Sequence, residues 1–227
     1  MSEGPRFEFE RQRRFTDLGT RILSRFLMRR PRSLRLENVE HDRNFQRRDI
    51  DLIWHRAIRG HEQTTLEIKC DAHIGVDEAL ARSDQYPYYA LRTDNFAVET
   101  VSNDGSGMPG WVFASEAEML LYYFVAIPRT VAEIEALSRI GEDYLLANLG
   151  IVGDRLYVLD LPELRDWFTL VQHNYHEVAA QNEGYRTLSR LVPCQDVVNA
   201  IKHCRVFDDV YQMVINPPAG SEPAGGC

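Results

Sequence analysis

The sequence lacks a hydrophobic run long enough to cross a membrane. Its longest strongly apolar stretch lies between Met119 and Ile127, well short of the roughly 20 residues that a transmembrane helix needs. The chain begins with polar and basic residues and shows no apolar segment followed by small residues, so we expect no secretory signal. These absences predict a cytoplasmic protein without a membrane partner.

Cysteine is scarce, and the four cysteines are scattered without paired spacing. This pattern is typical of reduced thiols rather than of a disulfide framework or a zinc cage. Two metal-binding alternatives stay open: Cys194 with His203 and Cys204, and the pair His173 and His176, three residues apart on a predicted helix. Packing and ordinary surface pairing would explain the same residues.

Lysine is rarer still, because of 26 basic residues only Lys69 and Lys202 are lysine. The net charge of −8 is uneven: residues 1–69 hold 16 basic against 11 acidic residues, whereas residues 70–227 hold 10 against 23. Local fields decide where a polyanion lies, so the basic front third is compatible with a phosphate backbone. A solvated, arginine-rich helix face would give the same count.

The remaining composition is that of an ordinary globular chain, with 44% hydrophobic and 26% charged residues. A length of 227 residues favours one domain, which we assign to residues 1–215. Residues 216–227 (NPPAGSEPAGGC) are rich in proline, glycine and alanine and are predicted to form a disordered tail.

Periodicity and turn signals predict an alternation of helices and strands. The first helix has Thr16 as its N-cap and Pro31 just beyond its end, and the helix at 115–123 rests on a capping-box order of Ser and Glu. Helices are predicted at residues 16–30, 115–123, 130–148 and 162–180. Strands are predicted at residues 49–57, 64–70, 96–102, 124–127, 156–159 and 188–192.

The first two predicted strands carry the residues best suited to chemistry. A short polar turn separates them, so we expect antiparallel pairing, with Asp49 and Asp51 on one face and Glu67 and Lys69 likewise sharing a face. Asp51 and Glu67 would offer carboxylates to Mg²⁺, with the Ile68 carbonyl as a third ligand. Lys69 would stabilise a hydroxide nucleophile or the phosphate charge.

Taken singly, these residues have ordinary explanations. Asp49 and Asp51 could be edge-strand charges, Asp49 could hold an arginine, and Glu67 with Lys69 could form a surface ion pair worth little to stability. Taken jointly, an acid, a second acid and a lysine that face one another across two strands favour a catalytic interpretation.

The order Asp51, then Glu67-Ile68-Lys69, resembles the PD-(D/E)xK nuclease superfamily, although Ile50 stands where the motif has proline. The stretches TLEIKCDAH, TDNFAVETVSN and PGWVFASEAEMLLYYF also resemble small uncharacterised nuclease-like proteins of phage and bacterial genomes. The resemblance implies an α/β fold with a restriction-endonuclease-like core, a central mixed sheet flanked by helices. It also implies that Glu99 and Asp17 assist Asp51 and Glu67 in binding metal.

The resemblance further implies a Mg²⁺-dependent nuclease in which Mn²⁺ substitutes, with DNA preferred to RNA, a 5′-phosphate product and possible homodimerisation. The alternative is a catalytically inactive nucleic-acid-binding or protein-interaction subunit of a phage, defence or recombination assembly. An aromatic group could stack bases or belong to the core: Tyr86, Tyr88, Tyr89 and Phe96. Polar and basic side chains are expected to contact nucleic acid: Arg21, Arg25, Arg29, Gln46, Arg47 and Arg48.

Overall fold

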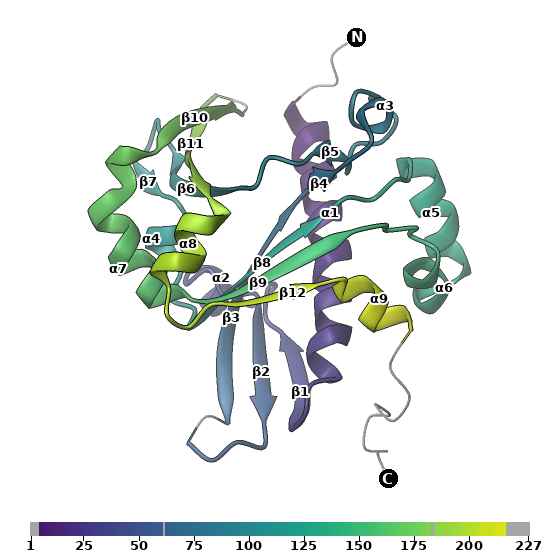
Figure 1. Cartoon of the computed structure of the whole chain (residues 1–227), viewed down its shortest axis with the longest axis horizontal. Helices are drawn as coiled ribbons and strands as arrows, with labels where there is room; N and C mark the ends of the chain where they lie inside the picture. Colours follow the sequence, from purple (N-terminus) through teal and green to yellow (C-terminus); the bar gives the residue numbers. More distant parts are fainter. Residues whose placement is uncertain (1–4, 61, 183, 217–227) are drawn as a thin grey trace.

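A computed structural model of the protein describes residues 5–60, 62–182 and 184–216. Its centre is a six-stranded sheet in the order β1-β2-β3-β8-β9-β12 (Figure 1). β3 and β8 run parallel and the other neighbours antiparallel, so the predicted central mixed sheet is confirmed. The strands are β1 (Ser33–Asn38), β2 (Leu52–Arg56), β3 (Gln63–Asp71), β8 (Met119–Val125), β9 (Asp154–Asp160) and β12 (Arg205–Asp208).

One face of this sheet is covered by α1 (Pro5–Met28), with α5 (Val131–Ile140), α6 (Glu142–Ala147) and α9 (Val210–Ile215) beside it. Leu18, Ile22 and Phe26 of α1 are buried against Leu66 and Ile68 of β3. The predicted first helix is therefore confirmed, and it ends before Pro31 as expected. It begins earlier than predicted, so Thr16 lies inside the helix rather than at its cap.

The opposite face carries a second, antiparallel sheet in the order β10-β11-β6-β7, together with three helices. The predicted strand at 96–102 is confirmed as β6, but it belongs to this second sheet. The strands are β6 (Asn95–Asn103), β7 (Met108–Pro109), β10 (His176–Gln181) and β11 (Arg186–Pro193). The helices on this face are α4 (Trp111–Ala114), α7 (Leu161–Val171) and α8 (Cys194–Ala200). The short connecting elements of the chain are α2 (Arg43–Gln46), α3 (Glu78–Ala81), η1 (Gln172–Asn174), β4 (His73–Gly75) and β5 (Ala90–Leu91).

The helix predicted at 115–123 is wrong, because this segment enters the central strand β8. Leu121 and Tyr123 are buried in the core under α1, while Leu120 and Tyr122 are buried in the core under the second sheet. A strand buried on both faces is a continuous apolar run without the alternation of a half-exposed strand. Glu118, expected in the capping box, instead accepts a hydrogen bond of 2.8 Å from the Thr65 backbone N–H.

The prediction for residues 162–180 is half wrong, because α7 ends at Val171 and β10 follows. His173 therefore lies in η1 and His176 begins β10, so they do not share a helical face. The helical stretch at 130–148 is confirmed but divided at Gly141. The strands at 156–159 and 188–192 are confirmed as β9 and β11.

Two further expectations concern the ends of the chain and its membrane character. The predicted tail lies, from residue 217 onward, outside the described residues. No helix within the described ranges is long and apolar enough to cross a bilayer.

Candidate active site

Asp51 and Glu67 lie close together where the pairing of β2 with β3 ends, and the charge of Asp51 raises the pKa of Glu67. The two strands pair antiparallel as far as Leu52 opposite Leu66, so Asp51 lies one residue before this pair and Glu67 one residue after it. The Asp51 backbone N–H donates to the Leu66 carbonyl at 2.9 Å. The Asp51 carboxylate then accepts a hydrogen bond of 2.7 Å from the Ile68 backbone N–H. The predicted antiparallel pairing is thus confirmed.

Glu67 is a buried carboxylate that the protein satisfies only in part. Its side chain is 3% exposed, and its Oε1 lies 2.6 Å from the Lys69 ammonium nitrogen. Its Oε2 is buried and has no hydrogen-bond partner among the described residues. Burial is the main reason why the pKa of Glu67 rises to about 8; the charges of Asp51 and Asp49 add to the rise, and Lys69 opposes it.

Lys69 lies on the same face of β3 as Glu67, toward the second sheet, because Leu66 and Ile68 alternate to the α1 side. Its side chain is 34% exposed, and its ammonium nitrogen lies 5.9 Å from the centre of the Trp111 ring. Burial acts to lower the pKa of Lys69. The negative charges of the surrounding carboxylates outweigh burial and raise that pKa above its usual value, so the ammonium stays charged.

Asp49 belongs to the same electrostatic cluster, although not in the way the sequence predicted. It precedes β2 in a left-handed turn with φ of 46°, so the prediction that it shares a strand face with Asp51 is wrong. Ser115 holds this turn by donating its hydroxyl to the Asp49 carbonyl at 2.7 Å. Burial raises the pKa of Asp49, whose charge acts on Asp51 and Glu67. The D-x-D spacing was the only sequence signal for this role.

Glu99 approaches the cluster from β6 in the second sheet. Burial raises the pKa of its carboxyl, and Lys69 opposes that rise. The carboxylate accepts hydrogen bonds from the Trp111 backbone N–H and from Ser102. Gly110 lets the segment before α4 pack directly on the β6 backbone, because a Cβ there would lie 2.2 Å from the Glu99 carbonyl oxygen. Glu99 therefore adds negative charge near Lys69 while its own carboxylate is held by other groups.

The cluster can be tested for its fit to a divalent cation. The charges of Asp51, Glu67 and Glu99 act on Lys69, and burial raises the pKa of all three carboxyl groups, so a cation bound beside them would favour their ionised forms. No three or more His, Cys, Asp or Glu side chains gather as a ligand set within the described ranges. Asp51 and Glu67 supply two carboxylates. The Ile68 carbonyl lies on the same edge of β3 as the Ile68 N–H that bonds to Asp51, so it is a third oxygen near them. With the unpartnered Oε2 of Glu67, these groups fit a hard cation such as Mg²⁺.

Asp17 is not brought to this cluster. It lies on α1, which covers the other face of the sheet, and its carboxylate pairs with Arg21 at 2.8 Å. The basic side of α1 is also engaged within the protein. Arg25 pairs with Asp143 at 2.6 Å, and Arg29 donates to the carbonyls of Met213 and Val214. These contacts tie α1 to α6 and α9, so α1 does not present a free row of guanidinium groups.

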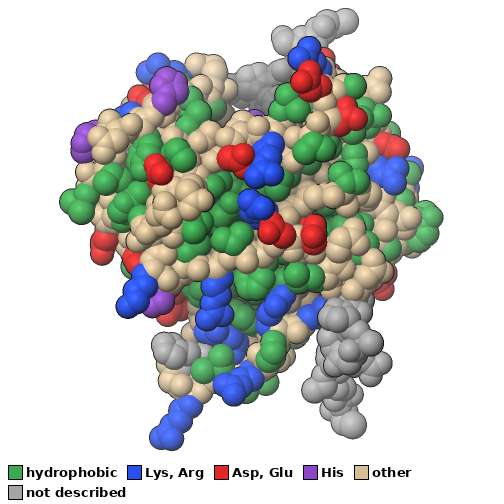
Figure 2. Space-filling model, in the orientation of Figure 1, with side chains coloured by type: hydrophobic (Ala, Val, Ile, Leu, Met, Phe, Trp, Pro, Cys, Tyr) green, Lys and Arg blue, Asp and Glu red, His purple; other side chains and the backbone are tan. Residues whose placement is uncertain are grey.

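Other basic and polar side chains lie nearer the acids. Gln46, Arg47 and Arg48 are exposed on the connection that leads from α2 to Asp49, and Arg48 pairs with Glu116 at 2.6 Å. Figure 2 shows further basic side chains gathered where β1, β2 and β3 project from the body of the molecule. The exposed arginines of that projection are Arg32, Arg35 and Arg59.

The remaining sequence candidates belong to the core or to local pairs. Tyr88, Tyr89 and Phe96 are buried, which favours the core interpretation over base stacking. Burial raises the pKa of Cys194 to about 11, and His203 pairs with Glu163. The thiols of Cys70, Cys194 and Cys204 are free, as predicted, while Cys227 lies outside the described residues.

Comparison of the chain with protein-family models, with curated proteins and with solved structures finds no match. The features that bear on function are the geometry and electrostatics of one cluster, which consists of Asp49, Asp51, Glu67, Lys69 and Glu99.

Proposed function

We propose that this protein is a Mg²⁺-dependent nuclease that hydrolyses phosphodiester bonds, with DNA as its first candidate substrate. The observation that carries the proposal is the buried Oε2 of Glu67, which has no partner among the described residues and lies beside the Lys69 ammonium and near the charge of Asp51. A buried polar atom without a partner is uncommon in proteins and calls for an explanation, such as an ion or a catalytic role. A bound cation would supply the missing partner.

Each residue of the cluster then has a defined task. Asp51, Glu67 and the Ile68 carbonyl would hold the cation, which would supply positive charge against the phosphate and acidify water. Lys69 holds a proton at its ammonium nitrogen and can stabilise negative charge on a hydroxide or on the attacked phosphate. Glu99 and Asp49 help to keep that ammonium charged, because the negative charge of each acid and the positive charge of Lys69 stabilise one another.

Burial strengthens these interactions. Trp111 and Tyr122 are buried beside the Lys69 position, Trp111 through its ring and Tyr122 as the β8 residue paired with Lys69. Charges interact more strongly where apolar groups exclude water. The Tyr122 hydroxyl is itself held, since it donates to Asp71 at 2.9 Å and accepts from the Ala97 N–H at 3.0 Å. These contacts hold the Tyr122 side chain in place next to Lys69.

A nucleic acid would approach over the basic surface next to the acids. Arg47 and Arg48 lie on the segment that leads to Asp49, Arg35 lies on β1 and Arg59 lies in the turn after β2, and all four are exposed. Figure 2 shows basic side chains over the projecting strands β1, β2 and β3. Arginine supplies several N–H donors in a planar fork that matches phosphate oxygens. A substrate backbone on these arginines would pass the cluster despite the net negative charge of the chain.

The test compares the two lysines of the sequence. Purified wild-type protein, Lys69→Ala and Lys202→Ala are incubated with supercoiled plasmid, linear duplex, single strands, a four-way junction and RNA, with Mg²⁺, Mn²⁺ or EDTA. Lys202 is exposed, and its backbone N–H donates a hydrogen bond to Glu163. Its side chain has no partner among the described residues, so Lys202→Ala is a matched control.

We expect cleavage that needs the metal, that is lost in Lys69→Ala and that persists in Lys202→Ala. Cleavage that survives in Lys69→Ala would assign the activity to a contaminant or to another site. Binding of nucleic acid without cleavage under every condition would favour the inactive binding subunit instead.

A further inference from the structure

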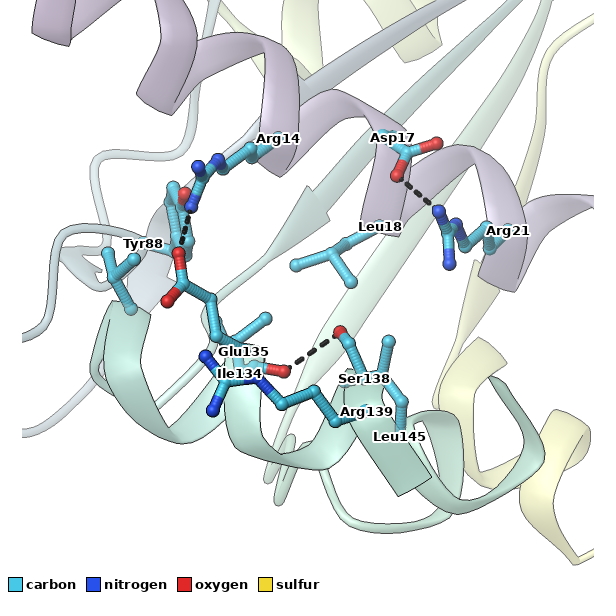
Figure 3. A pocket seen from close by; sticks show the side chains of 11 residues that line it. Arg14, Asp17, Leu18, Arg21, Tyr88, Ile134, Glu135, Ser138, Arg139 and Leu145 are labelled. Atoms are coloured by element: carbon cyan, nitrogen blue, oxygen red, sulfur yellow. Dashed lines mark hydrogen bonds and ion pairs between the residues drawn. The ribbon is translucent and has the colours of Figure 1, made fainter. Parts of the chain in front are cut away.

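A second site lies on the other side of the central sheet. A cavity of about 470 Å³ opens between α1 and α5 (Figure 3). Its apolar lining includes Leu18, Ile134 and Leu145, and its rim carries Arg14, Arg21 and Arg139. Small-molecule sites commonly enclose about 300–1,000 Å³. The size and the mixture of apolar lining and charged rim therefore suit a small organic ligand.

Among the described residues that line the cavity, three arginines stand against two acids, in a chain whose net charge is −8. Arg14 pairs with Glu135 at 2.7 Å, and Arg21 pairs with Asp17 at 2.8 Å, so these two pairs are neutral. Arg139 is exposed on the last turn of α5 and forms no hydrogen bond or ion pair with the side chains that the structure describes. One guanidinium group is thus left to attract an anion.

Tyr88, which lines the cavity, carries a buried hydroxyl that the described residues leave without a partner. Tyr88 lines the cavity and is 3% exposed, and its hydroxyl has no hydrogen bond within the described ranges. Its ring is fixed by stacking on Phe15, with the ring centres 5.2 Å apart. Burial is the main cause of the raised pKa of Tyr88, so the hydroxyl keeps its proton and can donate it to an acceptor. A ligand oxygen would satisfy it.

We infer that this cavity binds a phosphate monoester of about mononucleotide size. The phosphate would lie against the Arg139 guanidinium, with the Tyr88 hydroxyl donating to a ligand oxygen and the apolar body resting on Leu18, Ile134 and Leu145. Guanidinium pairs with phosphate through two parallel hydrogen bonds, which favours a phosphate over a neutral ligand. Because the cavity and the acid cluster lie on opposite faces of the sheet, this site does not depend on the proposed nuclease activity.

The test is calorimetric titration of the full chain in EDTA with adenosine 5′-monophosphate, adenosine or inorganic phosphate as the probe. We expect saturable binding of the monophosphate and binding that is at least about tenfold weaker for the other two probes, since each lacks half of the recognised chemistry. Arg139→Ala and Tyr88→Phe should weaken the monophosphate, the first by about tenfold or more. Arg205→Ala, which removes an exposed arginine from β12, should bind as the wild type does.

Several results would overturn the inference. If adenosine binds as tightly as the monophosphate, the site does not recognise the anion. If inorganic phosphate binds as tightly as the monophosphate, the site holds an adventitious ion only. Equal losses in Arg139→Ala and Arg205→Ala would mean non-specific attraction. Unchanged affinity in Tyr88→Phe would remove its hydroxyl from the site. Loss of binding in Glu67→Gln would assign the ligand to the acid cluster, whereas full binding there separates the two sites.

Discussion

The central sheet contains two buried carboxylates, Asp154 on β9 and Glu67 on β3, which differ in their hydrogen-bond partners. The Asp154 Oδ2 accepts hydrogen bonds from the Tyr123 hydroxyl and from the Tyr211 backbone N–H, the latter at 2.9 Å. Glu67 has the Lys69 ammonium on one oxygen and nothing described on the other. Burial raises both pKa values, to about 6 for Asp154 and about 8 for Glu67.

This contrast distinguishes a buried acid that stabilises the fold from one that is available to a ligand. A carboxylate that the protein satisfies from its own backbone and side chains fixes neighbouring elements, as Asp154 joins β9 to β8 and α9. A carboxylate left incomplete, next to further acids and a single lysine, is prepared for a partner from outside. Asp154 is therefore an internal control for Glu67.

The largest expected effect is on catalysis. Glu67→Gln removes a charged ligand while keeping nearly the same volume, so we expect metal-dependent cleavage to fall by about 10³-fold or more. Asp154→Asn should cleave at close to the wild-type rate. Initial rates on the best substrate, normalised to folded protein by circular dichroism, provide the measurement. Equal activity of the two variants would contradict the distinction between these acids.

The next effect is on the pH dependence of stability. Because the pKa of Asp154 is raised from 3.8 to about 6 in the folded state, its contribution is full below about pH 4 and is lost as the pH rises through 6. The loss is on the order of 3 kcal/mol, since one pKa unit is worth about 1.4 kcal/mol.

Asp154→Asn removes this titration and can keep both hydrogen bonds, because a single amide oxygen can replace Oδ2 as their acceptor. Relative to the wild type, the variant should therefore gain free energy of unfolding between pH 4 and pH 7. Urea unfolding at several pH values measures this. Parallel curves for the two proteins would argue against the raised pKa.

Metal binding should sharpen the comparison further. Adding Mg²⁺ at about 100 times its dissociation constant stabilises a protein by about 2.7 kcal/mol when only the folded state binds it. We expect Mg²⁺ to raise the melting temperature of the wild type and of Asp154→Asn by an amount that corresponds to this stabilisation. We expect no such rise in Glu67→Gln and Asp51→Asn. Removal of the metal with EDTA should reverse it. A similar rise in all four proteins would place the cation elsewhere.

The smallest effect comes from making Asp154 resemble Glu67. Tyr123→Phe deletes the hydroxyl that donates to Asp154 and leaves only the Tyr211 N–H. A buried charged acceptor that loses one donor costs about 1–3 kcal/mol, so the free energy of unfolding at pH 7 should fall by that amount. Combining Tyr123→Phe with Asp154→Asn should recover part of the loss. If the double variant is as unstable as the sum of its parts, the pair does not interact.

Much of the site could be predicted because its signals are local. The turn between residues 57 and 63 joins two short strands, and antiparallel pairing across such a turn sets Asp51 beside Glu67. The alternation of side chains then puts Lys69 on the same face as Glu67. Asp49 was harder to interpret, because its left-handed turn depends on Ser115, which lies 66 positions further along the chain.

The roles of the arginines and of Asp17 could not be read from the sequence. Arg21, Arg25 and Arg29 recur with helical spacing, but the partners of Arg25 and Arg29 lie more than 100 positions away, in α6 and α9. Helical spacing shows that such side chains share a face, but it does not show which segment packs against that face.

Local sequence signals are enough to predict the first helix, the antiparallel pair that carries Asp51, Glu67 and Lys69, and the shared face of Glu67 and Lys69, because each follows from the geometry of a few neighbouring residues. The folded structure was needed to show that residues 119–125 form a strand, that β6 enters a second sheet, and that the charges of Asp49 and Glu99 act on Lys69. Those outcomes depend on burial between two cores and on contacts between distant segments, which override local propensity.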